Sequence, residues 1–110
     1  MAKPETEMDL ITAVVRYSRA EATLQAALKA GAPGITYTWA RGTGVRQNLG
    51  FAGSFIESEK QVLWVVVPRS KAAKVIDAIA EAGNLQLPGE GFAYVQPVDR
   101  VVGFIAPKAP

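Results

Sequence analysis

Apolar residues gather in four short runs, each of the length and composition of a β-strand. The runs lie at residues 10–17, 34–41, 61–68 and 92–97. β-Branched and aromatic side chains are frequent in them, which is typical of strands. The second run alternates, with Ile35, Tyr37 and Trp39 on one face. The third run is apolar on both faces, which indicates a strand in the middle of a sheet.

Two segments with helical spacing of apolar residues separate these runs. The predicted helices cover residues 18–30 and 71–82. Ser18 and Glu21 stand three residues apart and predict a capping box at the start of the first helix. Ser70 is predicted to cap the second helix. Gly31 and Gly83 are predicted to end the two helices, Gly31 in a left-handed conformation.

The order of elements, βαββαβ, predicts an α+β fold of the ferredoxin-like type. Two helices should cover one face of a four-stranded antiparallel sheet, in a single domain that spans residues 1–110. Residues 99–105 could add a short strand or a turn. The other face of the sheet would expose Trp64 or its neighbours, and an apolar face of that size predicts a cyclic oligomer, a trimer or a dimer.

Composition excludes several functions. The chain of 110 residues contains no Cys and no His, so thiol chemistry, Ser-His catalysis and most transition-metal sites are excluded. The formal charge of +2 is too small to indicate nucleic-acid binding. No apolar run is long enough for a membrane span, and the first residues do not resemble a signal peptide. We therefore expect a soluble, cytoplasmic protein that is not an enzyme and holds no tightly bound metal.

Two glycine-rich segments are candidate binding sites. The first is Arg41-Gly42-Thr43-Gly44-Val45-Arg46, where backbone N–H groups and two arginines could hold an anion. It opens a long stretch, residues 42–60, with little periodicity, and a stretch of that length is usually functional or disordered. The second is Pro88-Gly89-Glu90-Gly91. A solvated loop and a plain turn remain the alternatives for the two segments, and solvated charges are favoured over acid–base chemistry for Glu57, Glu59 and Glu90.

The whole pattern resembles the PII signal-transduction proteins, and most of all their short, divergent PII-like branch, which includes carboxysome-associated and inorganic-carbon types. The resemblance runs from Leu10 to about Phe104. It rests on the segments Leu10–Val15, Ala27–Thr36, Arg41–Gly44, Val65–Val67, Val75–Ile79 and Gly89–Val95.

The resemblance implies a homotrimer that binds adenine nucleotides in clefts between subunits, without catalysis. It makes residues 42–60 the T-loop, 84–91 the B-loop and 99–110 the C-terminal segment. The T-loop would contact a target protein, such as a transporter, an enzyme or a carboxysome component. The implied nucleotide-binding residues are Gly34, Ile35, Thr36, Gly42, Gly44, Arg46, Gln47, Trp64, Val66, Gly89, Glu90, Gly91 and Arg100.

Departures from the family pattern affect the expected ligand. Phe92 stands where a basic residue usually follows the B-loop glycines, and the two C-terminal arginines fall near Gly103 and Ile105. Because these cations normally meet the outer phosphates, we expect ADP or AMP to be favoured over ATP, with cyclic AMP as a further candidate. Arg41 and Arg46 would also suit bicarbonate.

Two other interpretations stay open. One is a structural or partner-binding trimer of the CutA-like type, with the ferredoxin-like fold but without a nucleotide site. The other is a small, cofactor-free ferredoxin-like enzyme, which the absence of His disfavours.

Overall fold

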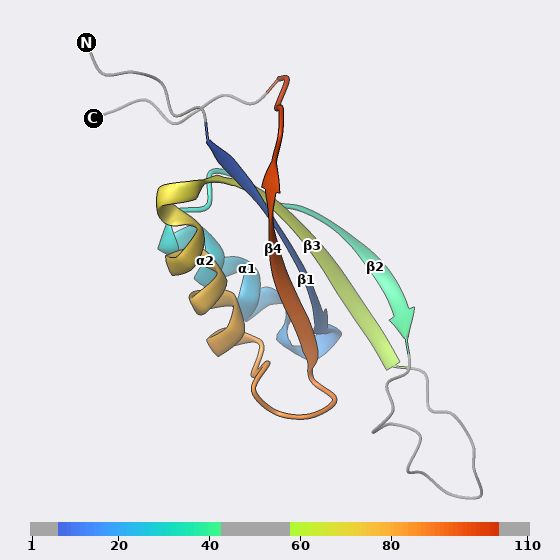
Figure 1. Cartoon of the computed structure of the whole chain (residues 1–110). Helices are drawn as coiled ribbons and strands as arrows, with labels where there is room; N and C mark the ends of the chain where they lie inside the picture. The colour runs from blue at the N-terminus through green and yellow to red at the C-terminus, as the bar shows by residue number, and fades with distance from the viewer. Residues whose placement is uncertain (1–6, 43–57, 104–110) are drawn as a thin grey trace, which may run out of the picture.

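The computed structural model describes residues 7–42 and 58–103, and these form one sheet, two α-helices and a short 3-10 turn (Figure 1). The elements are β1 (Met8–Arg16), η1 (Tyr17–Arg19), α1 (Ala20–Ala30), β2 (Thr36–Gly42), β3 (Ser58–Pro68), α2 (Arg69–Ala82) and β4 (Gly91–Val98). All four predicted strands and both predicted helices are confirmed, with shifts of one to three residues at most ends.

The four strands form an antiparallel sheet in the order β2-β3-β1-β4. Figure 1 shows both helices packed on one side of this sheet. The predicted α+β, ferredoxin-like fold is therefore confirmed. The apolar run predicted to be central is β3, which has a strand on each side, and β2 and β4 are the sheet edges.

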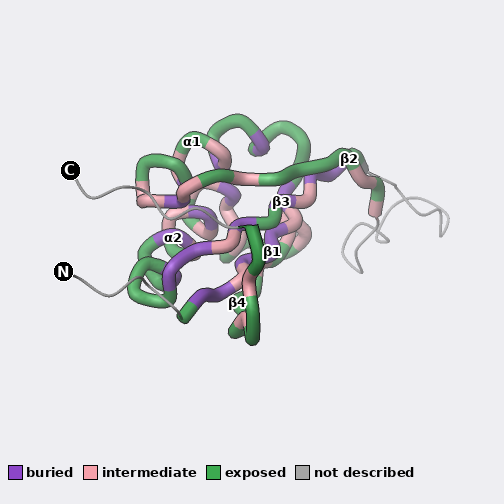
Figure 2. Tube along the Cα trace, turned by 90° about the horizontal axis from the view of Figure 1, so that it is seen from above, coloured by how far each residue is buried: buried purple, intermediate pink, exposed green. Residues whose placement is uncertain are grey.

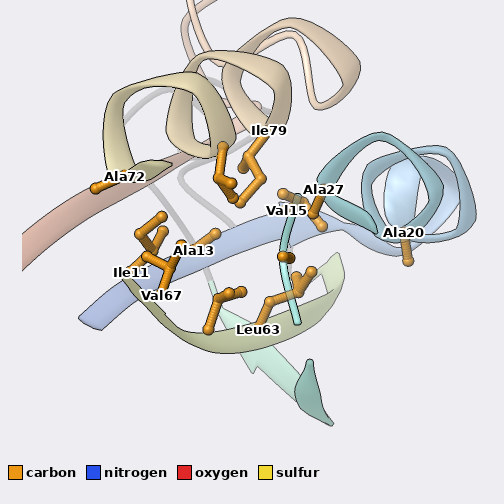
Figure 3. Close-up of a cluster of buried hydrophobic side chains, with 12 residues drawn as sticks. Ile11, Ala13, Val15, Ala20, Ala27, Leu63, Val67, Ala72 and Ile79 are labelled. Carbon is orange, nitrogen blue, oxygen red and sulfur yellow. The ribbon is translucent and has the colours of Figure 1, made fainter. Parts of the chain in front are cut away.

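The hydrophobic core lies between the helices and the covered face of the sheet (Figure 3). Alternate residues of β1 and β3 point into it because successive side chains of a strand face opposite ways. Val75 and Ile79 of α2 pack against them. The strand residues of the core are Ile11, Ala13, Val15, Leu63, Val65 and Val67, all without exposed surface.

No helix of the described residues lies on the opposite face of the sheet, and we call it the open face. It is formed by the intervening strand residues, among them Trp64 on β3 and the stacked pair Phe92 and Tyr94 on β4, whose ring centroids lie 6.3 Å apart. These three side chains are exposed, and Val62 and Val66 are only half-buried. The expectation that Trp64 faces outward is confirmed.

The starts of the two helices differ from the predictions. Ser18 lies inside η1, so α1 begins two residues later with Arg19 as its N-cap and without a side-chain cap. The capping-box prediction is wrong because the chain makes a 3-10 turn between β1 and α1. Ser70 does not cap α2 either, since β3 runs directly into that helix and Pro68 is the N-cap.

The helix ends agree better with the predictions. Gly31 has φ 116° and ends α1 in the left-handed conformation that favours glycine. Gly83 ends α2 with its amide bound to the carbonyl oxygen of Ile79 at 2.9 Å.

The segments around the predicted long loop also shift. β3 starts at Ser58, so residues 58–60 belong to the sheet rather than to the loop. Residues 43–57 and 104–110, which contain most of the predicted T-loop and C-terminal segments, lie outside the described residues. Residues 99–103 add no strand.

Candidate functional site

Two cations and one carboxylate meet at one end of the open face. Arg16 ends β1 and is paired in register with Lys60 of β3. Arg16 Nη1 lies 3.1 Å from Glu90 Oε2, which stands just before β4. Side chains of neighbouring antiparallel strands that stand opposite each other share a face. This sheet end therefore holds a basic cluster, Arg16 and Lys60, with one acidic neighbour.

Lys60 is buried, with 8% of its surface exposed. Burial lowers the pKa of its ammonium group below the ordinary value, and the charge of Arg16 lowers it further, whereas Glu90 raises it. Among the described residues, Lys60 has no salt bridge of its own. An approaching anion stabilises such a cation, because it compensates for the hydration that the ammonium group has lost.

The turn before β4 borders this cluster. Gly91 stands opposite Val15 of β1 and has φ 136°. A Cβ atom at this position would lie 2.0 Å from the carbonyl oxygen of Val14, so only glycine fits there. The turn is held by backbone hydrogen bonds such as that from the amide of Glu90 to the carbonyl oxygen of Leu87, at 3.3 Å. Gly91 therefore brings the turn close to Arg16 and Lys60.

A second group of predicted residues lies further along the open face. Thr36 of β2 pairs with Trp64 of β3, and Val66 follows two residues later on the same face. Trp64 and Lys60 are four residues apart on β3, a separation of roughly 13 Å at the rise of an extended strand. Within one chain, Trp64 and the cations are thus separate parts of one face.

The remaining predicted site residues have varied positions. Gly34 is exposed before β2, whereas Ile35 packs against the core, so its side chain does not face the open side. Gly42 ends β2 at the same sheet end as Lys60. Arg41 stands opposite Glu59 in the register, and both are exposed. Arg100 is exposed beyond β4. Gly44, Arg46 and Gln47 lie outside the described residues.

Sequence reasoning did not single out Arg16 and Lys60. The signal was available, because an antiparallel pairing of the first and third strands brings the end of one beside the start of the other. Placing Lys60 in the loop concealed it, since the strand begins at Ser58.

Within residues 7–42 and 58–103, no cluster of three acidic side chains could hold a metal ion. In the same two segments, no helix is both long and apolar enough to cross a membrane.

The comparison with protein families gives a direct result. The family model described as nitrogen regulatory protein P-II matches residues 8–105, nearly the whole chain. The chain belongs to the P-II family. Its match covers all four strands and both helices. A comparison with curated proteins found no match.

Solved structures with the same fold include a P-II protein. The structure of Arabidopsis thaliana PII bound to citrate is 28% identical, with a TM-score of 0.65 over 88% of this chain and 82% of that one. A Bacillus cereus protein related to NIF3 matches with a TM-score of 0.67 at 23% identity. That match covers 91% of this chain but only 28% of the longer Bacillus protein, so it shows a shared fold alone.

Proposed function

We propose that this P-II family protein is a non-catalytic regulator that binds an adenine nucleotide between subunits of a homotrimer. The observation that carries the proposal is the largely buried side chain of Lys60, which lies beside Arg16 and is bordered by the glycine turn before β4. In the proposal the phosphates of the nucleotide contact these two cations.

The open face supports the trimer. Its exposed aromatic and half-buried aliphatic side chains lie together on neighbouring strands, and apolar surface gathered in this way often marks an interface. Covering it with further copies of the chain would bury this surface. It would also allow Trp64 and Val66 of one subunit to lie near the cations of another, which matches the cleft expected between subunits.

The preference for ADP or AMP over ATP rests on missing cations. Phe92 directly follows the glycine turn and its side chain is exposed on the open face, where the family pattern has a basic residue. Each charge-assisted hydrogen bond lost to an outer phosphate costs about 1.5–3 kcal/mol. ATP, which carries the most outer phosphates, is therefore expected to lose the most affinity, whereas ADP, AMP and cyclic AMP depend less on the missing cations.

Other anions are candidates for the same cations. The Arabidopsis relative was solved with citrate, and carboxylates share with phosphates the oxygen geometry that Arg and Lys recognise. Bicarbonate is a further candidate, with Arg41 near the same sheet end.

The output in this proposal is a change in how the chain between Gly42 and Ser58 contacts a target protein. Both ends of that segment adjoin the cationic sheet end, because Gly42 and Ser58 pair in the register. A ligand at Lys60 would therefore bind close to both ends of the segment. By contacting one conformation of the segment better than another, it would increase the population of that conformation.

Calorimetric titration tests the proposal. The protein is titrated with AMP, ADP, ATP and cyclic AMP, each with and without bicarbonate, and with citrate as a competing anion. We expect saturable binding near one ADP or AMP per chain. No binding of any nucleotide by a trimeric protein would support the structural, CutA-like alternative and contradict the nucleotide site.

A further inference from the structure

A hollow of about 350 Å³ lies between the start of α1 and strand β2, on the face of the sheet opposite the cations. Gln61 of β3 lines it, and successive strand residues face opposite ways, so Lys60 belongs to the other face. Figure 2 shows that β2 beside the hollow is exposed along most of its length. A volume of this size is sufficient for a small organic group.

The walls of the hollow are aromatic. Tyr17 of η1 stacks on Trp39 of β2, with ring centroids 4.7 Å apart and planes inclined by 16°. Tyr37, two residues before Trp39, also lines the hollow. All three rings are exposed, Trp39 by 61%. They are therefore an accessible surface rather than part of the core.

The polar groups of the hollow include a carboxylate and a buried amide oxygen, beside the hydroxyl groups of Tyr17, Tyr37 and Thr38. The carboxylate is that of Glu21 on the first turn of α1, which also accepts a hydrogen bond from Gln25 Nε2 at 3.2 Å. None of the eight described residues that line the hollow is Lys or Arg. Gln61 is only 4% exposed, and its Oε1 atom is buried without a hydrogen-bond partner among the described residues. Because the terminal torsion of a glutamine side chain is broad, this oxygen can turn toward a donor in the hollow.

We propose that this hollow binds a guanidinium group. A guanidinium ion is planar, carries a positive charge and presents five N–H donors in a fixed geometry. Its flat face would lie against the ring of Tyr17 or Trp39 as a cation–π contact. Its N–H groups would donate to the Glu21 carboxylate and to Gln61 Oε1.

A guanidinium ion meets all these features, and simpler groups do not. An alkylammonium ion lacks the plane that stacks on a ring, and a neutral urea lacks the charge that the Glu21 carboxylate attracts. The guanidinium can belong to a free small molecule or to an arginine side chain of a protein segment, since both present the same group.

The test uses Trp39 as the reporter. The chain has two tryptophans, so Trp64→Phe leaves Trp39 as the source of tryptophan fluorescence. This protein is titrated with ethylguanidinium chloride at constant ionic strength, with ethylurea as the neutral isostere. We expect a saturable change with ethylguanidinium, with a dissociation constant on the order of 1–10 mM for so small a ligand, and none with ethylurea.

Matched variants separate the hollow from general charge effects. Glu21→Gln, made in the same background, should weaken ethylguanidinium binding about two- to fivefold, the range expected for an ion pair with an exposed carboxylate. Glu81→Gln removes an exposed carboxylate of α2 outside the hollow and should leave binding unchanged. Gln61→Met keeps the side-chain length, removes the amide oxygen and should also weaken binding.

The outcomes are distinct. Absence of saturation up to about 100 mM, which lies well above the expected range, would overturn the proposal. An equal response to ethylurea, or binding unaffected by Glu21→Gln, would overturn it too. Acetyl-Gly-Arg-Gly-amide and its citrulline analogue identify the source. Tighter binding of the Arg peptide than of ethylguanidinium indicates that the natural ligand is an arginine of a protein segment. Weaker binding of the peptide indicates a free small molecule. Nucleotide binding at Lys60 is measured separately, so either proposal can fail alone.

Discussion

The two faces of the same sheet differ in how they are completed. On the covered face, small and medium aliphatic residues such as Ile11, Leu63 and Val65 are fully buried by the chain's own helices. On the open face, Trp64, Phe92 and Tyr94 remain 37%, 54% and 44% exposed. The alternation of side chains along each strand thus builds one face that the helices bury and one that stays exposed in the single chain.

The candidate ligand site belongs to the uncompleted face. Lys60 and Arg16 lie at its end, where desolvation and the charge of Arg16 lower the pKa of the Lys60 ammonium group. The covered face thus holds the residues that stabilise the fold, and the open face holds the candidate binding residues. Substitutions on the covered face should unfold the chain, whereas those on the open face should change assembly and ligand binding.

The largest loss of stability is expected at Gly91, where β4 and β1 approach each other closely. Gly91→Ala would place a Cβ 2.0 Å from the carbonyl oxygen of Val14, at a φ of 136°. We expect the free energy of unfolding to fall by about 4 kcal/mol or more, which is the range of the most damaging substitutions. Urea denaturation followed by circular dichroism measures it.

Gly34→Ala is the control for this change, because a Cβ at Gly34 meets no atom within 4 Å. Its stability should stay within about 0.5 kcal/mol of the wild type. Equal stability of the two variants would show that β4 does not pair with β1 in this register.

The next effect concerns assembly. Trp64→Glu places a carboxylate in the middle of the open face, and its burial between subunits would cost far more than its exposure in a monomer. We expect the trimer to dissociate while the monomer stays folded. Sedimentation velocity measures the mass, and circular dichroism the helical content.

Leu28→Glu is the matched control, since Leu28 is an exposed apolar residue of α1 on the helical side. It should leave the assembly intact. Dissociation by Leu28→Glu with an intact Trp64→Glu trimer would place the subunit contact on the helices instead.

Replacing Lys60 should separate ligand binding from stability. Lys60→Met removes the charge and keeps most of the aliphatic side chain. We expect ADP to bind roughly ten- to a hundredfold more weakly, the equivalent of one charged hydrogen bond. The variant should be more stable than the wild type by up to about 1 kcal/mol. Lys74→Met, at an exposed position of α2, should change neither property.

The same variant makes a pH prediction. Because the pKa of Lys60 is lowered in the folded protein, the unfolded chain binds more protons between that pKa and 10.5. The stability of the wild type should therefore rise with pH in this interval, relative to Lys60→Met. Parallel urea titrations measure the stability of the wild type minus that of Lys60→Met at each pH, and a fall of this quantity with rising pH would contradict the environment described for Lys60.

The smallest loss of stability is expected at the ion pair between Arg16 and Glu90. Arg16→Ala removes this contact, in which both side chains are partly exposed. We expect a loss of about 0.2–1 kcal/mol that shrinks at high salt, as for other surface pairs. Arg19→Ala, at an exposed residue of η1, is the comparison, and a loss above about 2 kcal/mol at Arg16 would contradict a surface pair.

Much of the fold could be predicted because local patterns and tertiary structure agree. The runs that became β1 to β4, and the left-handed Gly31, follow from periodicity and backbone freedom. The helix starts could not be predicted from local signals. Ser18 and Ser70 have the right side chains for caps, but the strand directly before each helix sets where the chain turns.

The candidate site was only partly predictable for a similar reason. Glycines mark tight turns in a sequence, so Gly89 and Gly91 were found. Arg16 and Lys60 are 44 residues apart, and only strand pairing brings them together. Gln61 was not singled out because it stands in a run that predicts a buried apolar strand. The burial of its amide oxygen without a hydrogen-bond partner is visible only in three dimensions.

Native mass spectrometry of the protein with ADP tests the central claim, that the open face joins subunits and holds the ligand. We expect a trimer, with a mass of about three times the chain's 11.7 kDa, that carries up to three ADP molecules. Both the trimer and the bound ADP should be absent in Trp64→Glu. A wild-type monomer that binds ADP, or a trimer that binds none, would contradict it.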